Sequence, residues 1–454
     1  MLLTDGTREV TMRVFMLGWE FPPFISGGLG TACFGLTRAL DRLGTEVLFV
    51  LPRAVTNPAD THVQILSPAS ASANQAARAL AGLFQHTRFR AVPATLRPYT
   101  RPEDEADEED GAPGGRLAAG APRTRRVRTR APGITPPPQQ AGDAYGGDLF
   151  SEVERYASLA ATVASGEDFD VIHAHDWMTY LAGMAVQNQS GKPLVVHVHS
   201  TEFDRSGLNV NQRIYDIERA GMHAATKIIA VSHLTRSIVL KHYAIDPRKV
   251  EVVYNAIDDD GNVDGTPLPP ITRDEKIVLF LGRVTMQKGP EYFLAAAKRV
   301  LEVMDNVRFV MAGSGDMIRR MIQLAAEMGI GHKVLFTGFL RGNDVRRVYR
   351  MADLYVMPSV SEPFGLTPLE ALSNDVPVLI SKQSGVAEVL THALKVDFWD
   401  VDEMANKIVA VLRHPPLQAT LRDHGSFEVK RFSWADSAAN CLKVYQAALG
   451  AGVS

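Results

Sequence analysis

The chain of 454 residues carries 48 Lys and Arg against 51 Asp and Glu, which gives a formal net charge of −3. This length exceeds what one ordinary hydrophobic core supports, so we expect two domains. A hydrophobic fraction of 46% with 22% charged residues is typical of a globular enzyme. The balanced charge argues against nucleic acid or an anionic membrane as the partner.

Cysteines are rare, and Cys33 and Cys441 belong to no CxxC or Cys/His metal spacing. Their rarity is typical of a reducing compartment. No apolar run approaches the roughly 20 residues that span a bilayer. The leader MLLTDGTREVT lacks the apolar segment of a secretory signal. We therefore expect a cytoplasmic protein without a transmembrane segment.

Short apolar runs alternate with amphipathic segments along most of the chain. The first series of runs is RVFMLG, EVLFVLP, VIHAH, PLVVHVHS, KIIAVS and KVEVVYN, with helical patterns such as residues 31–43 and 211–225 among them. The second series is KIVLFLG, RFVMAG, KVLFTGF, DLYVMPS and PVLIS. Apolar strands joined by helices indicate parallel sheets covered on both faces. The predicted fold class is α/β, with two doubly wound domains whose ligand binds in the cleft between them, at the carboxyl ends of the strands.

The domain boundary is marked by residues 258–275, which are polar and rich in Gly and Pro. We assign residues 1–265 to the first domain and residues 270–430 to the second. Residues 97–142 carry the acidic run EDEADEED, then RTRRVRTR, then a Pro-rich stretch. Opposite charge blocks with few large apolar residues indicate a mobile insertion, to which we assign no function.

A glycine-rich loop, GWEFPPFISGGLG, follows the first strand and leads into a helix. Gly27 and Gly28 allow a ligand to approach the backbone closely, and the start of the helix directs N–H groups at an anion. A nicotinamide site is the weaker hypothesis, because the third glycine of that fingerprint falls on Cys33 and the second strand ends without an acid for a ribose. A turn that only packs tightly is the plain alternative.

Two histidine pairs lie on strands, in VIHAHDWM and VVHVHS. His175 and His199 fall at the strand ends where the cleft should open, whereas we expect His173 and His197 to be structural. No cysteine or HExxH pattern accompanies either pair, so we expect no metal site.

Two cations, Arg283 and Lys288, follow the first strand of the second domain in LFLGRVTMQKG. Arginine offers a fixed fork for phosphate oxygens and lysine a mobile point charge. Ordinary surface cations are the alternative. Gly313, in VMAGSGD, lies at another strand-to-helix turn that suits a base or a phosphate.

The segment SEPFGLTPLEAL places Glu362 and Glu370 on either side of a bend that opens into a helix. Backbone N–H groups of Gly365–Thr367 are suited to hold a diphosphate without a metal, assisted by the two cations. The carboxylates suit neutral sugar hydroxyls, although Glu370 also fits a plain role at a helix N-terminus.

Together these motifs resemble the retaining glycosyltransferases with two Rossmann-like domains (the GT-B type), in particular family four and the glycogen/starch synthases. The resemblance rests on GGLG, HAHDW, GR…QKG and E-x7-E in the family's order, and covers nearly the whole chain apart from residues 97–142. It implies hexosyl transfer with retention of anomeric configuration, without metal or cofactor. It also implies that the C-terminal helix within residues 431–454 returns to the first domain.

The resemblance also assigns roles to residues. Arg283 and Lys288 would hold and stabilise the leaving diphosphate, Glu362 would lie beside the transferred sugar, and His175 would face that sugar near the reacting centre. We treat these four as catalytic candidates. The expected substrate-binding residues are Gly27, Gly28, His199, Gly313, Pro363, Phe364, Gly365, Leu366, Thr367 and Glu370.

The leading hypothesis for the substrates is glucose transfer from a nucleotide-sugar, such as ADP-glucose or UDP-glucose, to a growing α-glucan. In bacterial glycogen and starch synthases a lysine commonly lies two positions before the paired glycines, where this chain has Ile25. This departure weakens the inference of ADP-glucose and favours family four. The alternatives are transfer to a smaller acceptor or surface polysaccharide precursor, a sugar-nucleotide epimerase, and a glycan-binding protein without catalysis.

Overall fold

The computed structural model describes residues 12–21, 27–53, 64–66, 84–94, 96, 149–257 and 275–451. Ile25, the 97–142 segment and nearly all of the expected linker, residues 258–274, lie outside these described residues. Within them, no helix is both long and apolar enough to cross a bilayer.

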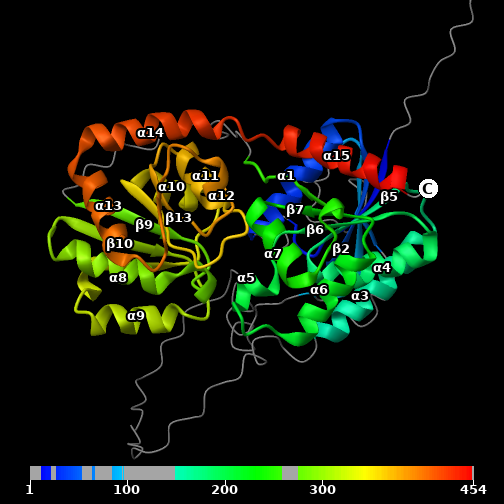
Figure 1. The fold of residues 1–454 in the computed structure, drawn as a ribbon, viewed down its shortest axis with the longest axis horizontal. Coiled ribbons are helices and arrows are strands. Elements are labelled where there is room, and N and C mark those ends of the chain that lie inside the picture. Colours follow the sequence, from blue (N-terminus) through cyan, green and yellow to red (C-terminus); the bar gives the residue numbers. More distant parts are fainter. Residues whose placement is uncertain are drawn as a thin grey trace, which may run out of the picture.

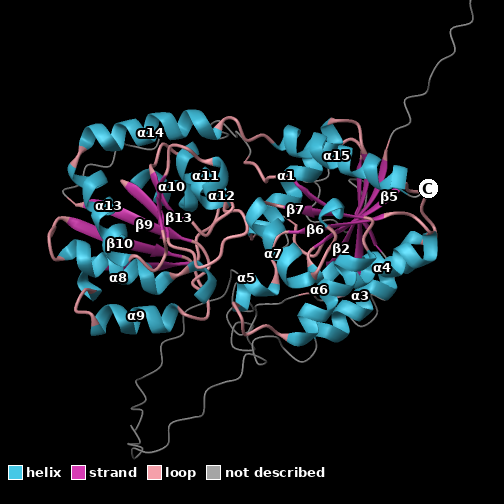
Figure 2. Ribbon diagram, in the orientation of Figure 1, coloured by secondary structure: helices cyan, strands magenta, loops and turns pink. Residues whose placement is uncertain are grey.

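The first domain is built on an eight-stranded sheet with the order β3-β4-β2-β1-β5-β6-β7-β8 (Figures 1 and 2). Neighbouring strands are parallel except β3, which runs antiparallel to β4. The strands are β1 Arg13–Leu17, β2 Glu46–Arg53, β3 Gln64–Leu66, β4 Thr87–Pro93, β5 Val171–His175, β6 Leu194–Val198, β7 Lys227–Ala230 and β8 Val250–Val252. The helices are α1 Gly28–Arg42, α3 Leu149–Ala164, α4 Trp177–Ser190, α5 Glu202–Ser206, α6 Gln212–Ala224, α7 His233–Tyr243 and the 3₁₀ helix η2 Pro247–Lys249.

The second domain contains a six-stranded, wholly parallel sheet with the order β11-β10-β9-β12-β13-β14. Its strands are β9 Lys276–Leu281, β10 Val307–Ala312, β11 Val334–Gly338, β12 Leu354–Met357, β13 Val378–Ser381 and β14 Leu394–Val396. Its helices are η3 Met286–Lys288, α8 Pro290–Leu301, α9 Ile318–Glu327, η4 Gly331–Lys333, α10 Asn343–Met351, α11 Leu366–Ser373, α12 Val386–Val389, α13 Val401–Arg413 and α14 Pro415–Val429. The two doubly wound sheets confirm the predicted fold class.

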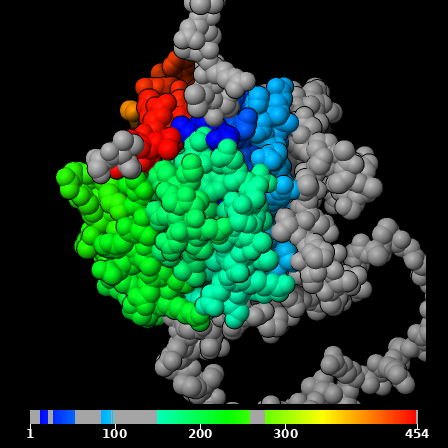
Figure 3. Space-filling model, turned by 90° about the vertical axis from the view of Figure 1, so that its right-hand side faces the viewer, coloured from blue at the N-terminus to red at the C-terminus, as the bar shows by residue number. Residues whose placement is uncertain are grey.

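The last helix, α15 (Trp434–Gly450), crosses back from the second domain to the first (Figure 1). It begins where the Ser433 hydroxyl accepts a hydrogen bond from the Asp436 N–H, and it packs against α1 and β5 to β7. Seen end-on, the red C-terminal segment lies beside dark-blue residues from the N-terminal part of the chain (Figure 3). Buried side chains of α15, including Cys441 and Tyr445, therefore complete one face of the first sheet.

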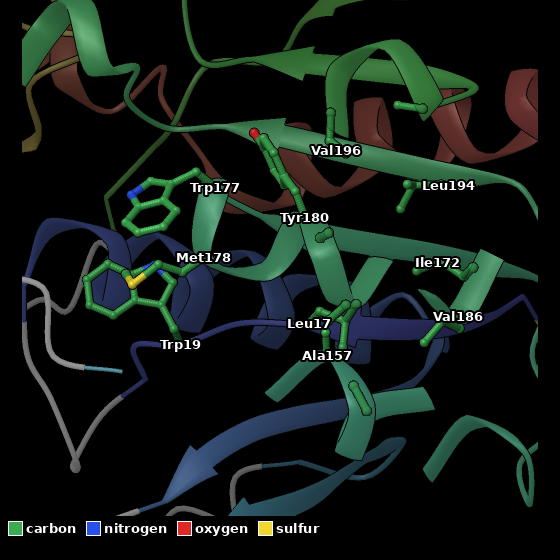
Figure 4. Packing of buried hydrophobic residues seen from close by; sticks show 14 of the residues in the cluster. Leu17, Trp19, Ala157, Ile172, Trp177, Met178, Tyr180, Val186, Leu194 and Val196 are labelled. Atoms are coloured by element: carbon green, nitrogen blue, oxygen red, sulfur yellow. The ribbon is translucent and has the colours of Figure 1, made fainter. Parts of the chain in front are cut away.

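The other face of the first sheet is covered by α3 and α4. Figure 4 shows Trp19, Trp177 and Met178 gathered near the carboxyl ends of the strands, with Ile172 and Leu194 deeper in this core. Because these side chains are almost wholly buried, they fix the loop after β1 against the start of α4.

Three strands had no counterpart in the apolar runs. β4 is only half apolar, because Arg88 and Arg90 alternate with buried residues and both pair with Glu167. β3 and β14 have three residues each, too few for a period to be recognised.

Candidate active site

Loops at the carboxyl ends of the two sheets contact each other directly, and we call this region the interdomain junction. Ser361 donates a hydrogen bond of 2.6 Å to Asp204 Oδ1 of α5. Ser232, at the start of α7, donates one of 2.6 Å to the carbonyl of Pro363. The residues on both sides of Glu362 are thus held by the first domain, which places this carboxylate at the junction.

Glu362 and Lys288 form an ion pair across two loops of the second domain. The Lys288 Nζ to Glu362 Oε2 distance is 2.5 Å, and the Ser359 hydroxyl donates to the same oxygen at 3.3 Å. The Glu362 side chain is 8% exposed and that of Lys288 is 22% exposed, so solvent screens the pair only in part. The pair holds the ammonium group beside the carboxylate at the junction.

Arg283 follows β9 and faces Glu20, which follows β1 in the other domain. The Glu20 carboxylate is buried and accepts hydrogen bonds from the N–H groups of Gly27 and Gly30, at the start of α1. Burial raises the pKa of Glu20, while the Arg283 guanidinium acts in the opposite direction. Part of the glycine loop's N–H array therefore serves an internal carboxylate, and the substrate-binding role of Gly27 and Gly28 stays a prediction.

Gly27 and Gly28 differ in their surroundings. A Cβ atom at Gly27 would lie 2.2 Å from Glu20 Oε1, so close approach of the carboxylate requires glycine there. At Gly28 a Cβ would meet no atom within 4 Å among the described residues, which leaves this glycine on the open side of the loop.

Helix α11 starts at the bend of SEPFGLTPLEAL. Gly365 has φ +107°, a backbone conformation that favours glycine, and gives no side-chain cap to the helix that begins at Leu366. Thr367 Oγ1 accepts a hydrogen bond of 2.8 Å from Tyr355. The Phe364 side chain is 2% exposed and packs near Tyr254, so only its backbone remains for a substrate role.

Glu370 lies one turn into α11 and accepts a hydrogen bond of 2.9 Å from the Tyr349 hydroxyl. Burial raises the pKa of this carboxyl group, and the hydrogen bond from Tyr349 opposes the shift. The carboxylate is thus oriented by α10 on the same sheet edge as Arg283.

Gly313 follows β10 and lies against the turn that carries Arg283. It has φ +138°, and a Cβ atom there would lie 1.9 Å from the carbonyl oxygen of Gly282. Ser314 O accepts a hydrogen bond of 2.8 Å from the Val284 N–H. The glycine therefore permits the two turns to pack, which is a structural reason for its presence.

Gly313→Ala should destabilise the protein much more than Gly329→Ala. Both glycines have positive φ, but Gly329 has no atom within 4 Å of its virtual Cβ among the described residues. Backbone strain of about 1–3 kcal/mol applies to both variants. Overpacking adds about 1–3 kcal/mol at Gly313 alone. Urea unfolding measures the difference, and equal losses in the two variants would contradict the packing argument.

Four imidazoles lie close together in the first domain, with His173 and His175 on β5, His197 on β6 and His199 directly after β6. Ring centroids are 4.1 Å apart for His173 and His175, and also for His197 and His199. Across the strands, His175 Nδ1 lies 2.9 Å from His199 Nε2, and His173 Nε2 lies 3.2 Å from His197 Nδ1. The Tyr445 hydroxyl is 2.7 Å from His173 Nδ1.

Burial is the main cause of a lowered pKa at all four histidines, to about 3 for His173 and His199. The imidazoles are therefore neutral at pH 7. No cysteine lies near these histidines in the sequence. In the fold, however, α1 brings the Cys33 thiol within 4.8 Å of ring nitrogens of His175 and His199. The expectation of no metal site was based on sequence spacing, which does not reveal this contact.

His197 should make the stability of the protein depend on pH below its ordinary pKa of about 6.5. The unfolded chain binds a proton there that the folded chain rejects, because the folded pKa is lower. Stability conferred by neutral His197 is thus lost as the pH falls below 6.5. The wild-type minus His197→Leu difference in unfolding free energy should fall by about 1.2 kcal/mol from pH 6 to pH 5. A difference that does not vary with pH in urea titrations would contradict this assignment.

Asp176 is a site residue that the sequence reasoning missed. It has φ 59° and ψ 169°, a region that costs a non-glycine residue about 1–3 kcal/mol. Its Oδ1 accepts hydrogen bonds from the N–H groups of His199 and Ser200, at 2.8 and 3.2 Å. Burial raises its pKa to about 7. Asp176 follows β5, and its carboxylate holds the backbone after β6, so it connects the ends of the two strands. The sequence HDW does not by itself indicate this role.

Comparisons with known proteins agree with this architecture. Residues 269–426 match the family described as Glycosyl transferases group 1, residues 112–260 match Glycosyltransferase Family 4, and residues 13–103 match the Starch synthase catalytic domain. An uncharacterised glycosyltransferase of Methanocaldococcus jannaschii is 33% identical over 300 residues, which cover 62% of this chain and 76% of that protein. The chain belongs to the glycosyltransferases. The resemblance to family four and the starch synthases is thereby confirmed.

Further relatives of this glycosyltransferase differ in their named activities. The alpha-maltose-1-phosphate synthase of Mycolicibacterium smegmatis is 31% identical over 63% of this chain and 80% of its own length. Sucrose-phosphate synthase of Thermosynechococcus elongatus shares the fold, with a TM-score of 0.69, 19% identity and coverage of 96% and 98% of the two chains. Anabaena HepE, crystallised with UDP and glucose, has a TM-score of 0.65 and 15% identity over 96% of this chain and all of its own. These structural neighbours establish the GT-B fold of the glycosyltransferase.

Proposed function

We propose that this glycosyltransferase is a retaining, metal-independent hexosyltransferase that uses a nucleotide-sugar donor and no cofactor. One observation carries the proposal. Arg283 and the Lys288–Glu362 pair lie at the carboxyl edge of the second sheet, where α11 also begins. Cations and a helix N-terminus at one edge suit a diphosphate, and the neighbouring carboxylate suits sugar hydroxyls.

The donor would change the partner of Lys288. An arriving diphosphate offers the ammonium group a second anion, and the first turn of α11 adds backbone N–H donors. Glu362 is then released to accept hydrogen bonds from hydroxyls of the transferred sugar. Arg283 and Lys288 together offset the charge that develops on the leaving diphosphate, a task that a metal ion performs in other transferases.

Transfer breaks the bond between the anomeric carbon and the leaving phosphate oxygen and forms a bond from that carbon to an acceptor hydroxyl oxygen. In the retaining mechanism that the family resemblance implies, the acceptor attacks on the face from which phosphate leaves. The acceptor's proton passes to a phosphate oxygen of the leaving group. His175 and His199 lie on the first-domain side of the junction and, being neutral, can face a sugar without repelling the cations of the second domain.

Glucose is the proposed sugar, from UDP-glucose or ADP-glucose, and an α-glucan is the leading acceptor. The starch synthase match over residues 13–103 supports the glucan. A small phosphorylated acceptor is the second candidate, because relatives include the maltose-1-phosphate synthase and a D-inositol 3-phosphate glycosyltransferase of Segniliparus rotundus that is 27% identical over 67% of its length.

A screen for nucleotide release tests these proposals. The protein is incubated with UDP-, ADP- and GDP-sugars, each with glycogen, glucose 1-phosphate, inositol 3-phosphate or no acceptor. Release that depends on glycogen, with an α-linked product by proton NMR, is the expected result. Release that depends on a phosphorylated acceptor alone would support the second candidate. Conversion of the donor sugar without a glycosylated product would indicate an epimerase and overturn the transferase mechanism.

A further inference from the structure

The histidine array contains nitrogen atoms whose bonding within the protein is incomplete. Nε2 of His175 and Nε2 of His197 are buried, and neither has a hydrogen-bond partner among the described residues. Both side chains are almost wholly buried, with exposed fractions of 0% and 2%. Buried polar atoms without a partner are rare, and each calls for an explanation such as an ion.

The donor atoms around His175 have the composition of a metal site. The Cys33 sulfur and ring nitrogens of His175 and His199 all lie within 4.8 Å of one another. Neutral imidazole and thiolate are the ligands that select Zn²⁺-like ions over Mg²⁺ or Ca²⁺.

Distances between the donor atoms approach those of a tetrahedral site. Two nitrogen ligands at about 2.0–2.1 Å from zinc are roughly 3.3 Å apart. His175 Nδ1 and His199 Nε2 are 2.9 Å apart as a hydrogen-bonded pair, so an ion held between these two atoms would replace that hydrogen bond. The unpartnered Nε2 of His175 is available to an ion without breaking a hydrogen bond. His175 is the last residue of β5, His199 directly follows β6, which is parallel to β5, and the thiol comes from α1.

The electrostatic surroundings also favour a cation. The side chains of Glu20 and Asp176 are buried and lie close enough to Cys33 to act on its thiol electrostatically. Where these carboxyl groups are ionised, they attract a divalent ion. A bound ion in turn favours the thiolate, which is the form that coordinates metals.

We propose that Cys33, His175 and His199 bind one divalent transition-metal ion of the Zn²⁺ class. Binding releases the thiol proton to solvent and forms one sulfur–metal and two nitrogen–metal bonds, with the fourth position left for water. His199 is only partly buried, so solvent can reach the open position from its side. The proposed function adds a consequence: an occupied site withdraws both imidazoles from the donor sugar and inhibits transfer.

Cobalt titration of the whole chain tests the site without any sugar substrate. After treatment with a chelator, Co²⁺ should bind with one ion per chain and give the near-ultraviolet charge-transfer band of a thiolate ligand. Cys33→Ser should lose this band and bind Co²⁺ at least tenfold more weakly. The matched variant Cys441→Ser, at the other buried cysteine, should retain both. Absence of stoichiometric binding by the wild type, or a band that survives Cys33→Ser, would overturn the proposal.

Cys33→Ser could lose Co²⁺ binding only because it misfolds, so the test also uses a second variant and the thiolate band of the wild type. His199→Gln, at a partly buried position, should also weaken Co²⁺ binding at least tenfold while circular dichroism stays unchanged. Cobalt bound without a thiolate band would assign the ion to the group of His173, His175 and His197 instead, which contradicts the proposed ligands. These results do not depend on the transfer reaction. If transfer is observed, equal rates with and without Zn²⁺ at saturating metal would refute the inhibitory role alone.

Discussion

Arg283→Ala is expected to lower kcat/KM for transfer by about ten- to a hundredfold while the protein remains folded. The exposed guanidinium follows β9 at the junction and lies outside the hydrophobic cores, although it also acts on the buried carboxylate of Glu20. A charged hydrogen bond to a phosphate contributes about 1.5–3 kcal/mol. Losing this stabilisation in the transition state lowers kcat/KM by about ten- to a hundredfold. Steady-state kinetics with saturating acceptor and a range of donor concentrations measure it.

Arg299→Ala is the matched control for this variant. Arg299 lies on α8 of the same domain and forms exposed ion pairs with Glu302 and Asp402. Exposed pairs contribute little to stability, so the control should keep wild-type kinetics and a nearly unchanged melting temperature. Near-normal kcat/KM in Arg283→Ala would remove this residue from the donor site.

Glu362→Ala is expected to have the larger effect, a loss of at least about a hundredfold in kcat. The variant removes the proposed acceptor for the sugar hydroxyls and frees the Lys288 ammonium from a 2.5 Å ion pair. It thus disturbs both the sugar and the diphosphate ends of the donor. Interactions made more strongly in the transition state affect kcat rather than KM, which separates this role from simple donor binding.

Glu362→Gln tests which property of the side chain matters. Glutamine keeps the size and one acceptor oxygen but loses the charge that pairs with Lys288. We expect activity between those of the wild type and Glu362→Ala. Glu403→Ala, which removes an exposed partner of Lys407 on α13, is the control for loss of a carboxylate. Equal activity of Glu362→Ala and the wild type would refute the proposed role.

Much of the fold followed from local patterns in the sequence. Near-continuous apolar runs identified most strands of both parallel sheets, because strands buried on two faces need apolar residues at nearly every position. β4 was not predicted, because two of its positions are arginines that form ion pairs with Glu167. A local pattern of apolar residues does not reveal such distant ion pairs. The start of α11 was predicted from the glycine and proline pattern alone.

The candidate site was less accessible to sequence reasoning. Strand-end positions brought Arg283, Lys288 and Glu362 into consideration, and the structure places them on one sheet edge. Glu20 and Asp176 were missed, since a carboxylate's use depends on which backbone N–H groups the fold turns toward it. The nearness of Cys33 to His175 is likewise a tertiary contact, as more than a hundred residues separate them in the chain.

A crystal structure of the protein with UDP bound would test the central claim most directly. We predict that the diphosphate lies within about 3 Å of the Arg283 guanidinium and of backbone N–H groups in the first turn of α11, which is hydrogen-bonding distance. The Lys288 ammonium should then contact a phosphate oxygen, and its pair with Glu362 should be longer than 2.5 Å. A diphosphate bound elsewhere, with Arg283 making no contact to it, would contradict the assignment of the donor site.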